Sequence, residues 1–95
     1  MKLLWADPSL EHLAAIRSYI AKQDPAAAAR VVARVHDVTR HMLSASPYAG
    51  RPGRVANTRE LVIAKTPYIV AYRIAAGRIT VLAVIHSSRQ WPEVL

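Results

Sequence analysis

The hydrophobic pattern of this 95-residue chain changes its period near residues 47–54, and this change constrains the fold more than any other feature. Before this segment, apolar residues recur every three or four positions, which is typical of amphipathic helices; after it they alternate, as in strands. The segment itself holds two of the three glycines and two of the six prolines, so it can be neither helix nor central strand. Helices followed by strands predict an α+β fold, in one domain spanning residues 1–95.

Two helices are expected before residue 47, and each begins at an Asp-Pro pair. Asp7-Pro8 and Asp24-Pro25 can each supply a carboxylate cap and a proline in the first turn, where the missing N–H is not needed. The first helix is expected to run to about Lys22, and the second through Met42. Their apolar stripes have helical spacing and consist of Leu13, Ile16 and Ile20 in the first and Val31, Val35, Val38 and Met42 in the second. So short a joint predicts a hairpin of two helices.

Three strands are expected after the Gly/Pro segment, at residues 59–64, 68–74 and 79–86. The connections between them have hairpin length, which predicts a three-stranded antiparallel meander. The helices should pack on one face of this sheet, and the short apolar segment Leu3–Trp5 could add a fourth strand. Tyr68 and Tyr72 share one face of the middle strand, and a place in the core is favoured over base stacking for both.

The charge of the chain is strongly positive and unevenly distributed. The formal net charge is +7, and ten of the 13 basic residues are arginine. Residues 51–95 carry seven basic and only two acidic side chains. This half should therefore attract an acidic partner, either nucleic acid or an acidic protein.

Several classes of protein are excluded by residues that the chain lacks. The absence of cysteine excludes disulfides, thiol nucleophiles and thiolate zinc sites. Only His36 and His41 are near each other among the four histidines, and a spacing of five places them on different sides of a helix, so no metal site is expected. No apolar run approaches the roughly 20 residues of a membrane span. We expect a cytoplasmic protein without a cofactor.

Glu60, Arg73 and His86 lie on three successive predicted strands and could form a catalytic site. If the register brings them to one surface, they supply a carboxylate, a fixed cation and a group that titrates near neutral pH. RNA cleavage by the neighbouring 2′-hydroxyl needs such a base, charge stabiliser and acid. Alternatively, Glu60 and Arg73 form a cross-strand ion pair and His86 caps the sheet, and the spacing alone favours this structural role.

A second set of candidate residues is basic or aromatic. Arg51, Arg54 and Arg59 cluster in and just after the Gly/Pro segment, where they could hold phosphate or a partner's carboxylates, or form a solvated basic loop. Arg89 and Trp91 follow the last strand. The indole of Trp91 is expected to fold back as a lid on the edge of the sheet, the alternative being that it waits for a partner.

Four motifs occur in an order and spacing that resemble the toxins of the RelE/ParE superfamily, and most of all its ParE branch. They are Gly50-Arg51-Pro52-Gly53-Arg54, Thr58-Arg59-Glu60-Leu61, Pro67-Tyr68-Ile69-Val70-Ala71-Tyr72-Arg73, and Val84-Ile85-His86 with Arg89-Gln90-Trp91-Pro92. The resemblance covers nearly the whole chain, because the expected strand, helical hairpin and meander follow the order of that family. One departure is Asn57, where ParE-like sequences commonly have glycine. Asparagine tolerates a left-handed backbone, so the turn should be kept.

The resemblance implies the toxin of a type II toxin–antitoxin system, neutralised by a cognate antitoxin whose C-terminal segment wraps the toxin. Acidic side chains of that antitoxin could pair with the arginine-rich half of the chain. Candidates for binding the antitoxin or the target are Arg51, Arg54, Arg59, Arg89 and Trp91. ParE-like toxins act on DNA gyrase, and this branch is favoured, which implies an inhibitor that is not itself an enzyme.

RelE-like toxins instead cleave messenger RNA in the ribosome, and this endoribonuclease activity is the alternative. Related nucleases use a histidine followed at once by an aromatic residue, whereas His86 is followed by Ser87, and Trp91 cannot transfer a proton in catalysis. In favour of this alternative, Glu60, Arg73 and His86 lie where some nucleases of the family carry a glutamate, an arginine and a histidine. A basic nucleic-acid-binding module is a third interpretation, which explains the charge but not the motifs.

Overall fold

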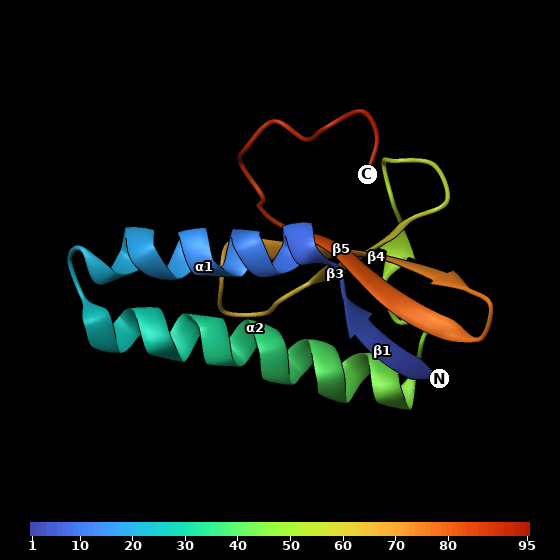
Figure 1. Ribbon diagram of the computed structural model, residues 1–95, viewed down its shortest axis with the longest axis horizontal. Helices are drawn as coiled ribbons and strands as arrows, with labels where there is room; N and C mark the ends of the chain where they lie inside the picture. Colours follow the sequence, from blue (N-terminus) through green and yellow to red (C-terminus); the bar gives the residue numbers. More distant parts are fainter.

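The chain forms an α+β structure in which two helices cover one face of a five-stranded sheet (Figure 1). The computed structural model describes residues 1–95. The elements follow the order β1 (Lys2–Trp5), α1 (Asp7–Ala21), α2 (Pro25–Ala45), β2 (Arg51–Pro52), β3 (Arg59–Val62), β4 (Tyr68–Ala75) and β5 (Arg78–His86). Neither helix is long and apolar enough to cross a membrane.

The strands have the order β1-β5-β4-β3-β2 across the sheet. The predicted meander is confirmed, because β3 pairs with β4 and β4 with β5, both antiparallel. The N-terminal segment does add a strand, and β1 lies parallel to β5 at one edge. At the other edge the Gly/Pro segment contributes β2, a strand of two residues that was not predicted. Pro52 is tolerated there because an edge strand can leave one side unpaired.

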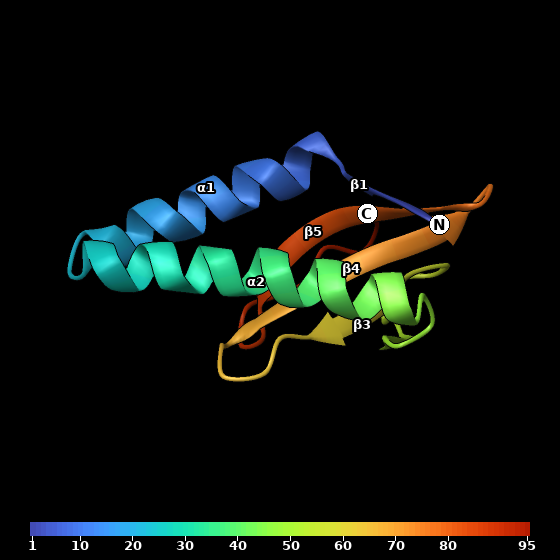
Figure 2. The same cartoon turned by 90° about the horizontal axis from the view of Figure 1, so that it is seen from below.

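The two helices lie side by side on the same face of the sheet, as Figure 2 shows from below. The second Asp-Pro pair acts as predicted, since the Asp24 carboxylate accepts a hydrogen bond from the Ala27 N–H at 3.0 Å. The first does not, and the prediction that Asp7 caps α1 is wrong. Ala6 holds the capping position with an extended backbone, so Asp7 is already inside the first turn, where its side chain cannot reach back to the free N–H groups.

Removing the cap of α2 should destabilise the protein measurably. We expect Asp24→Ala to lower the free energy of unfolding by about 1 kcal/mol, because it removes the carboxylate that binds the Ala27 N–H. Asp7→Ala is the matched control and should cost less than half as much, because Asp7 interacts only with the helix dipole. Urea unfolding followed by circular dichroism measures both. Equal losses for the two variants would contradict the assignment of the caps.

The core lies between the helices and the facing side of the sheet. Tyr72 is fully buried and Tyr68 is 7% exposed, so the prediction that both tyrosines belong to the core is confirmed. The Tyr72 hydroxyl donates a hydrogen bond to the Pro47 carbonyl oxygen at 2.8 Å and accepts one from the Gly50 N–H at 2.9 Å. These two bonds join the central strand to the loop that follows α2, and so fix the start of the arginine-rich segment.

Candidate functional site

The carboxylate of Glu60 is the centre of the arginine-rich segment. Glu60 is 2% exposed and accepts five hydrogen bonds, all from Arg51 and Arg54. Arg51 Nη2 lies 3.0 Å from Oε1, and Arg54 binds Oε2 through its backbone N–H at 2.8 Å and its Nε at 3.1 Å. Burial alone would raise the pKa of the Glu60 carboxyl, but the hydrogen bonds from Arg54 and then Arg51 outweigh it and hold the pKa below its ordinary value.

This arrangement corrects one sequence-based expectation. Glu60 does not form the expected cross-strand ion pair with Arg73, because Arg51 and Arg54 occupy both of its oxygens. Arg51 and Arg54 stay about half exposed, with 55% and 45% of their side-chain surfaces accessible. Two guanidinium groups share one carboxylate, so the cluster keeps one excess positive charge for an acidic partner.

Trp91 folds back onto this cluster. The guanidinium carbon of Arg54 lies 3.9 Å from the centre of the indole ring, a cation–π contact. Figure 1 shows the segment after β5 returning toward the loop that follows β2. The expectation that the indole acts as a lid is confirmed. Arg54 therefore links the buried Glu60 on one side to the C-terminal segment on the other.

The three residues of the predicted nuclease site do not meet. Side chains alternate between the faces of a strand, and residues that lie opposite each other in a pair share a face. Glu60 lies opposite Ala71, and Arg73 is two residues further along β4. Glu60 and Arg73 are therefore both on the face of the sheet that points away from the helices. His86 lies opposite Tyr68 and is therefore on the helix side, where its ring packs edge-on against Tyr68 with ring centres 5.5 Å apart. The register thus separates the histidine from the carboxylate and the arginine.

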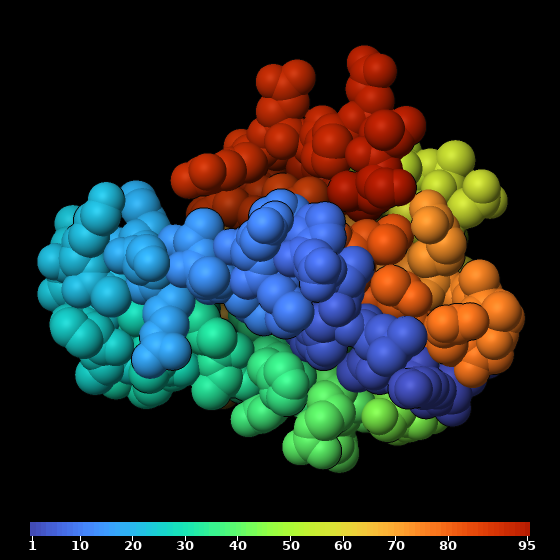
Figure 3. Space-filling model, viewed as in Figure 1, coloured from blue at the N-terminus to red at the C-terminus, as the bar shows by residue number.

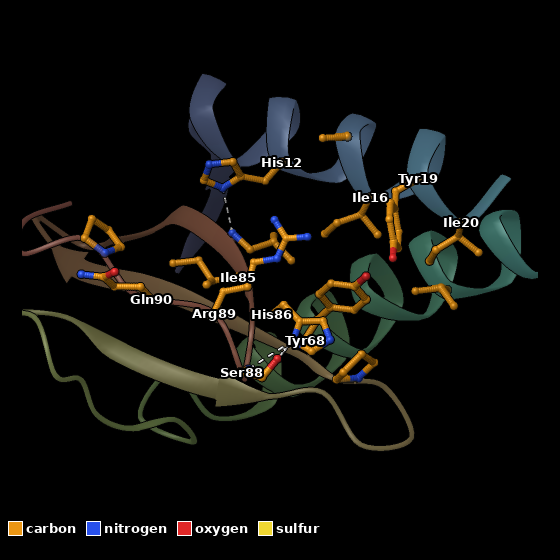
Figure 4. Close-up of a pocket in the computed structure, with 15 residues that line it drawn as sticks. His12, Ile16, Tyr19, Ile20, Tyr68, Ile85, His86, Ser88, Arg89 and Gln90 are labelled. Carbon is orange, nitrogen blue, oxygen red and sulfur yellow. Dashed lines mark hydrogen bonds between the residues drawn. The ribbon is translucent and has the colours of Figure 1, made fainter. Parts of the chain in front are cut away.

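A groove of about 860 Å³ lies beside His86 on the helix side of the sheet (Figure 4). Its walls are α1, Val31 of α2, the first residue of β4, the end of β5 and the C-terminal segment, which borders α1 in the space-filling view (Figure 3). Apolar surface comes from Ile16 and Ile20, and Tyr19, which is 65% exposed, stands at the rim. The sequence signal for this groove is Tyr19, a large aromatic residue next to the apolar stripe of the first helix.

The polar groups of the groove offer hydrogen-bond donors and no carboxylate. His12 Nδ1 accepts the Val84 N–H at 3.1 Å, and His86 Nδ1 accepts the Ser88 N–H at 3.1 Å, which leaves the Nε2–H of each ring as its donor. Burial raises the pKa of the Tyr68 hydroxyl, which therefore stays protonated. Arg89 adds a positive charge, and no Asp or Glu lines the groove. An apolar groove with hydrogen-bond donors and a positive charge suits an amphipathic segment that carries carboxylates.

Arg59 has a structural role that the sequence did not predict. Its Nε donates to the Gly50 carbonyl oxygen at 2.9 Å, and its Nη2 to the Tyr48 carbonyl oxygen at 3.3 Å.

Asn57 adopts the left-handed backbone expected of it, with φ of 63°. No group of three or more His, Cys, Asp or Glu side chains is arranged to hold a metal ion.

The sequence and the fold of this chain are both similar to those of one family of known proteins. The sequence model of the ParE toxin of the type II toxin–antitoxin system parDE matches residues 3–91. "Putative toxin Y4kP" of Sinorhizobium fredii is 47% identical over 94 residues, which cover 99% of this chain and 96% of that protein. Toxin RelE2 of Caulobacter vibrioides is 33% identical over 88 residues, which cover 93% and 97%. A solved structure of the chromosomal ParDE system from P. aeruginosa superposes with a TM-score of 0.78 at 27% identity, covering 90% of this chain and 95% of that chain.

Proposed function

We propose, because this chain belongs to the ParE toxin family of type II toxin–antitoxin systems, that it inhibits DNA gyrase and is neutralised by direct binding of a cognate antitoxin. The observation that carries the proposal is the family match over residues 3–91. The groove beside α1 and the excess charge at Glu60 supply two surfaces for an acidic, amphipathic partner. The antitoxin would lay its apolar side chains along α1 and its carboxylates toward Arg89 and the cluster.

The groove can be tested with one exposed side chain. We expect Tyr19→Ala to weaken antitoxin binding about tenfold, because a tyrosine that becomes buried against the partner contributes on the order of 1–2 kcal/mol. The change should leave the unfolding temperature unaltered, since Tyr19 is 65% exposed. Isothermal titration with the small protein encoded by the adjacent reading frame measures the affinity.

Leu10→Ala is the matched control for this experiment. Leu10 lies on the same helix and is 49% exposed, but it does not line the groove. Its replacement should leave the affinity unchanged. An unaltered affinity in Tyr19→Ala, or an equal loss in both variants, would place the antitoxin elsewhere on the toxin.

Gyrase inhibition is tested directly with purified enzyme. Micromolar toxin should block supercoiling of relaxed plasmid or accumulate cleaved DNA, and the toxin mixed beforehand with its antitoxin should do neither. The absence of both effects at that concentration would refute the proposed target. The same protein sample must bind antitoxin, so that an unfolded preparation is not mistaken for an inactive one.

The alternative target, messenger RNA in the ribosome, makes a different prediction in cells. Induction of the chain in a bacterial host should raise the DNA-damage response and cause filamentation while messages stay intact. Rapid message cleavage without DNA damage would instead support the endoribonuclease. His86→Ala would then be decisive, because a nuclease needs a proton-transferring group and a gyrase inhibitor does not.

A further inference from the structure

A second hollow, of about 520 Å³, lies at the opposite end of β4 from the groove. It is lined by Tyr48 from the loop after α2, by Arg59 at the start of β3 and by Arg73 near the end of β4. None of these residues contacts the groove, and the gyrase and antitoxin proposals do not use them in combination. The hollow therefore needs an explanation of its own.

The hollow carries positive charge with no counterion. Neither Arg59 nor Arg73 forms an ion pair with a carboxylate. The only acidic residue on the strands is Glu60, and Arg51 and Arg54 already neutralise it. Arg78 lies opposite Ala75 at the same end of the sheet and adds a further cation. An anion bound here would meet no competing carboxylate.

Arg59 is held in place before any ligand arrives. The carbonyl oxygens of Gly50 and Tyr48 accept hydrogen bonds from its Nε and Nη2. A guanidinium group has five N–H donors, so three remain for a ligand. A cation that is already fixed loses little side-chain entropy on binding, which favours recognition of phosphate oxygens.

Tyr48 supplies an aromatic surface beside these cations. It is 63% exposed, so its ring is accessible to a stacking partner. The guanidinium carbon of Arg59 lies 5.4 Å from its ring centre and restrains it. A restrained ring beside one fixed cation, Arg59, and a second cation, Arg73, supplies the two elements with which proteins bind single strands, a stacking platform and a positive track.

We propose that this hollow binds single-stranded nucleic acid, with a base stacked on Tyr48 and the adjoining phosphates on Arg59 and Arg73. An acidic peptide would use the same cations, but it would leave the Tyr48 ring without a stacking partner. The site needs neither gyrase nor antitoxin, so it is a further property of this toxin and can fail without affecting the proposed target.

Fluorescence anisotropy with labelled oligonucleotides of about ten thymidines or ten uridines tests the site on the wild-type protein and its variants. We expect Tyr48→Ala to weaken binding roughly 5–150-fold, the range that corresponds to loss of one stacked base. Arg73→Gln should weaken binding and lower the slope of log affinity against log salt by about 0.7, because one phosphate contact is lost. Tighter binding of one of the two oligonucleotides identifies the physiological class, and either result supports the site.

Two variants on α1 test whether losing any exposed tyrosine or arginine weakens binding, wherever it lies on the surface. Tyr19→Ala removes an equally exposed tyrosine, and Arg17→Gln removes an exposed arginine, both far in sequence from the hollow. Neither should change the affinity for the oligonucleotides by more than about twofold, because salt screens the effect of losing one distant surface charge. Equal losses in Arg17→Gln and Arg73→Gln, or full binding in Tyr48→Ala, would overturn the proposal. So would a polyglutamate peptide that binds as tightly as the oligonucleotides and is weakened equally by Tyr48→Ala.

Discussion

Replacing Glu60 with glutamine should lower the free energy of unfolding by about 2–3 kcal/mol at pH 7. The carboxylate is 2% exposed and accepts hydrogen bonds from both Arg51 and Arg54. An amide keeps the shape but offers only one acceptor oxygen, so it leaves two guanidinium groups close together without a counter-charge. The loss stays below that of a fully buried pair because both arginines are about half exposed to solvent.

The pH dependence gives this prediction a second readout. The folded-state pKa of Glu60 is lowered, so its stabilisation is complete above the unfolded-state pKa of about 4.3 and is lost as the pH falls through the folded value. The stability difference between wild type and Glu60→Gln should therefore narrow below about pH 4. Urea unfolding at several pH values measures this. Glu93→Gln, an exposed change of the same charge in the C-terminal segment, should be neutral throughout.

Adding one methyl group at Gly50 should destabilise the fold by about 2–4 kcal/mol, from an overpacking cost of about 1–3 kcal/mol and a lost hydrogen bond of about 1 kcal/mol. A Cβ atom there would lie 2.7 Å from both Cε1 and the hydroxyl oxygen of Tyr72, and 2.8 Å from the Glu60 carbonyl oxygen. The Tyr72 ring is fully buried and the third contact is backbone, so none of these atoms can move away cheaply. The shift would also break the hydrogen bond from the Gly50 N–H to Tyr72.

Gly77→Ala is the comparison for Gly50→Ala. A Cβ atom at Gly77 would meet nothing within 4 Å, so its only cost is the left-handed backbone, with φ of 72°. That cost is about 1 kcal/mol. Thermal unfolding should therefore show a clearly lower midpoint for Gly50→Ala than for Gly77→Ala. Similar midpoints would mean that the loop after α2 shifts to accommodate the added Cβ atom without moving Tyr72.

Local signals in the sequence predicted most of the fold. The Asp24-Pro25 pair marks the start of α2, and hairpin-length connections define the meander from β3 to β5. Alternation of apolar residues correctly placed Tyr68 and Tyr72 in the core. Each of these features depends on residues that are close together in the sequence, so a local pattern is enough to predict it.

The arrangement of the candidate site could not be predicted in the same way. Whether Glu60 binds Arg73 or the two earlier arginines depends on how the loop closes over β3, which no local pattern encodes. His86 is predicted on the right strand, but a strand's pairing register decides its face, and a shift of one residue reverses it. The groove combines α1 with the C-terminal segment, two parts of the chain that are separated in the sequence by α2 and four strands.

The parallel pairing of β1 with β5 also determines when the sheet can close during synthesis. Lys2 lies opposite Arg78, so the first strand must wait for a partner made 76 residues later. At elongation rates of about 5–20 residues per second that interval is roughly 4–15 s, whereas a helical hairpin can form within milliseconds. During that interval any helical hairpin that forms lacks the strand β5 that covers its apolar stripe in the finished fold, so the stripe is open to other contacts until β5 is made.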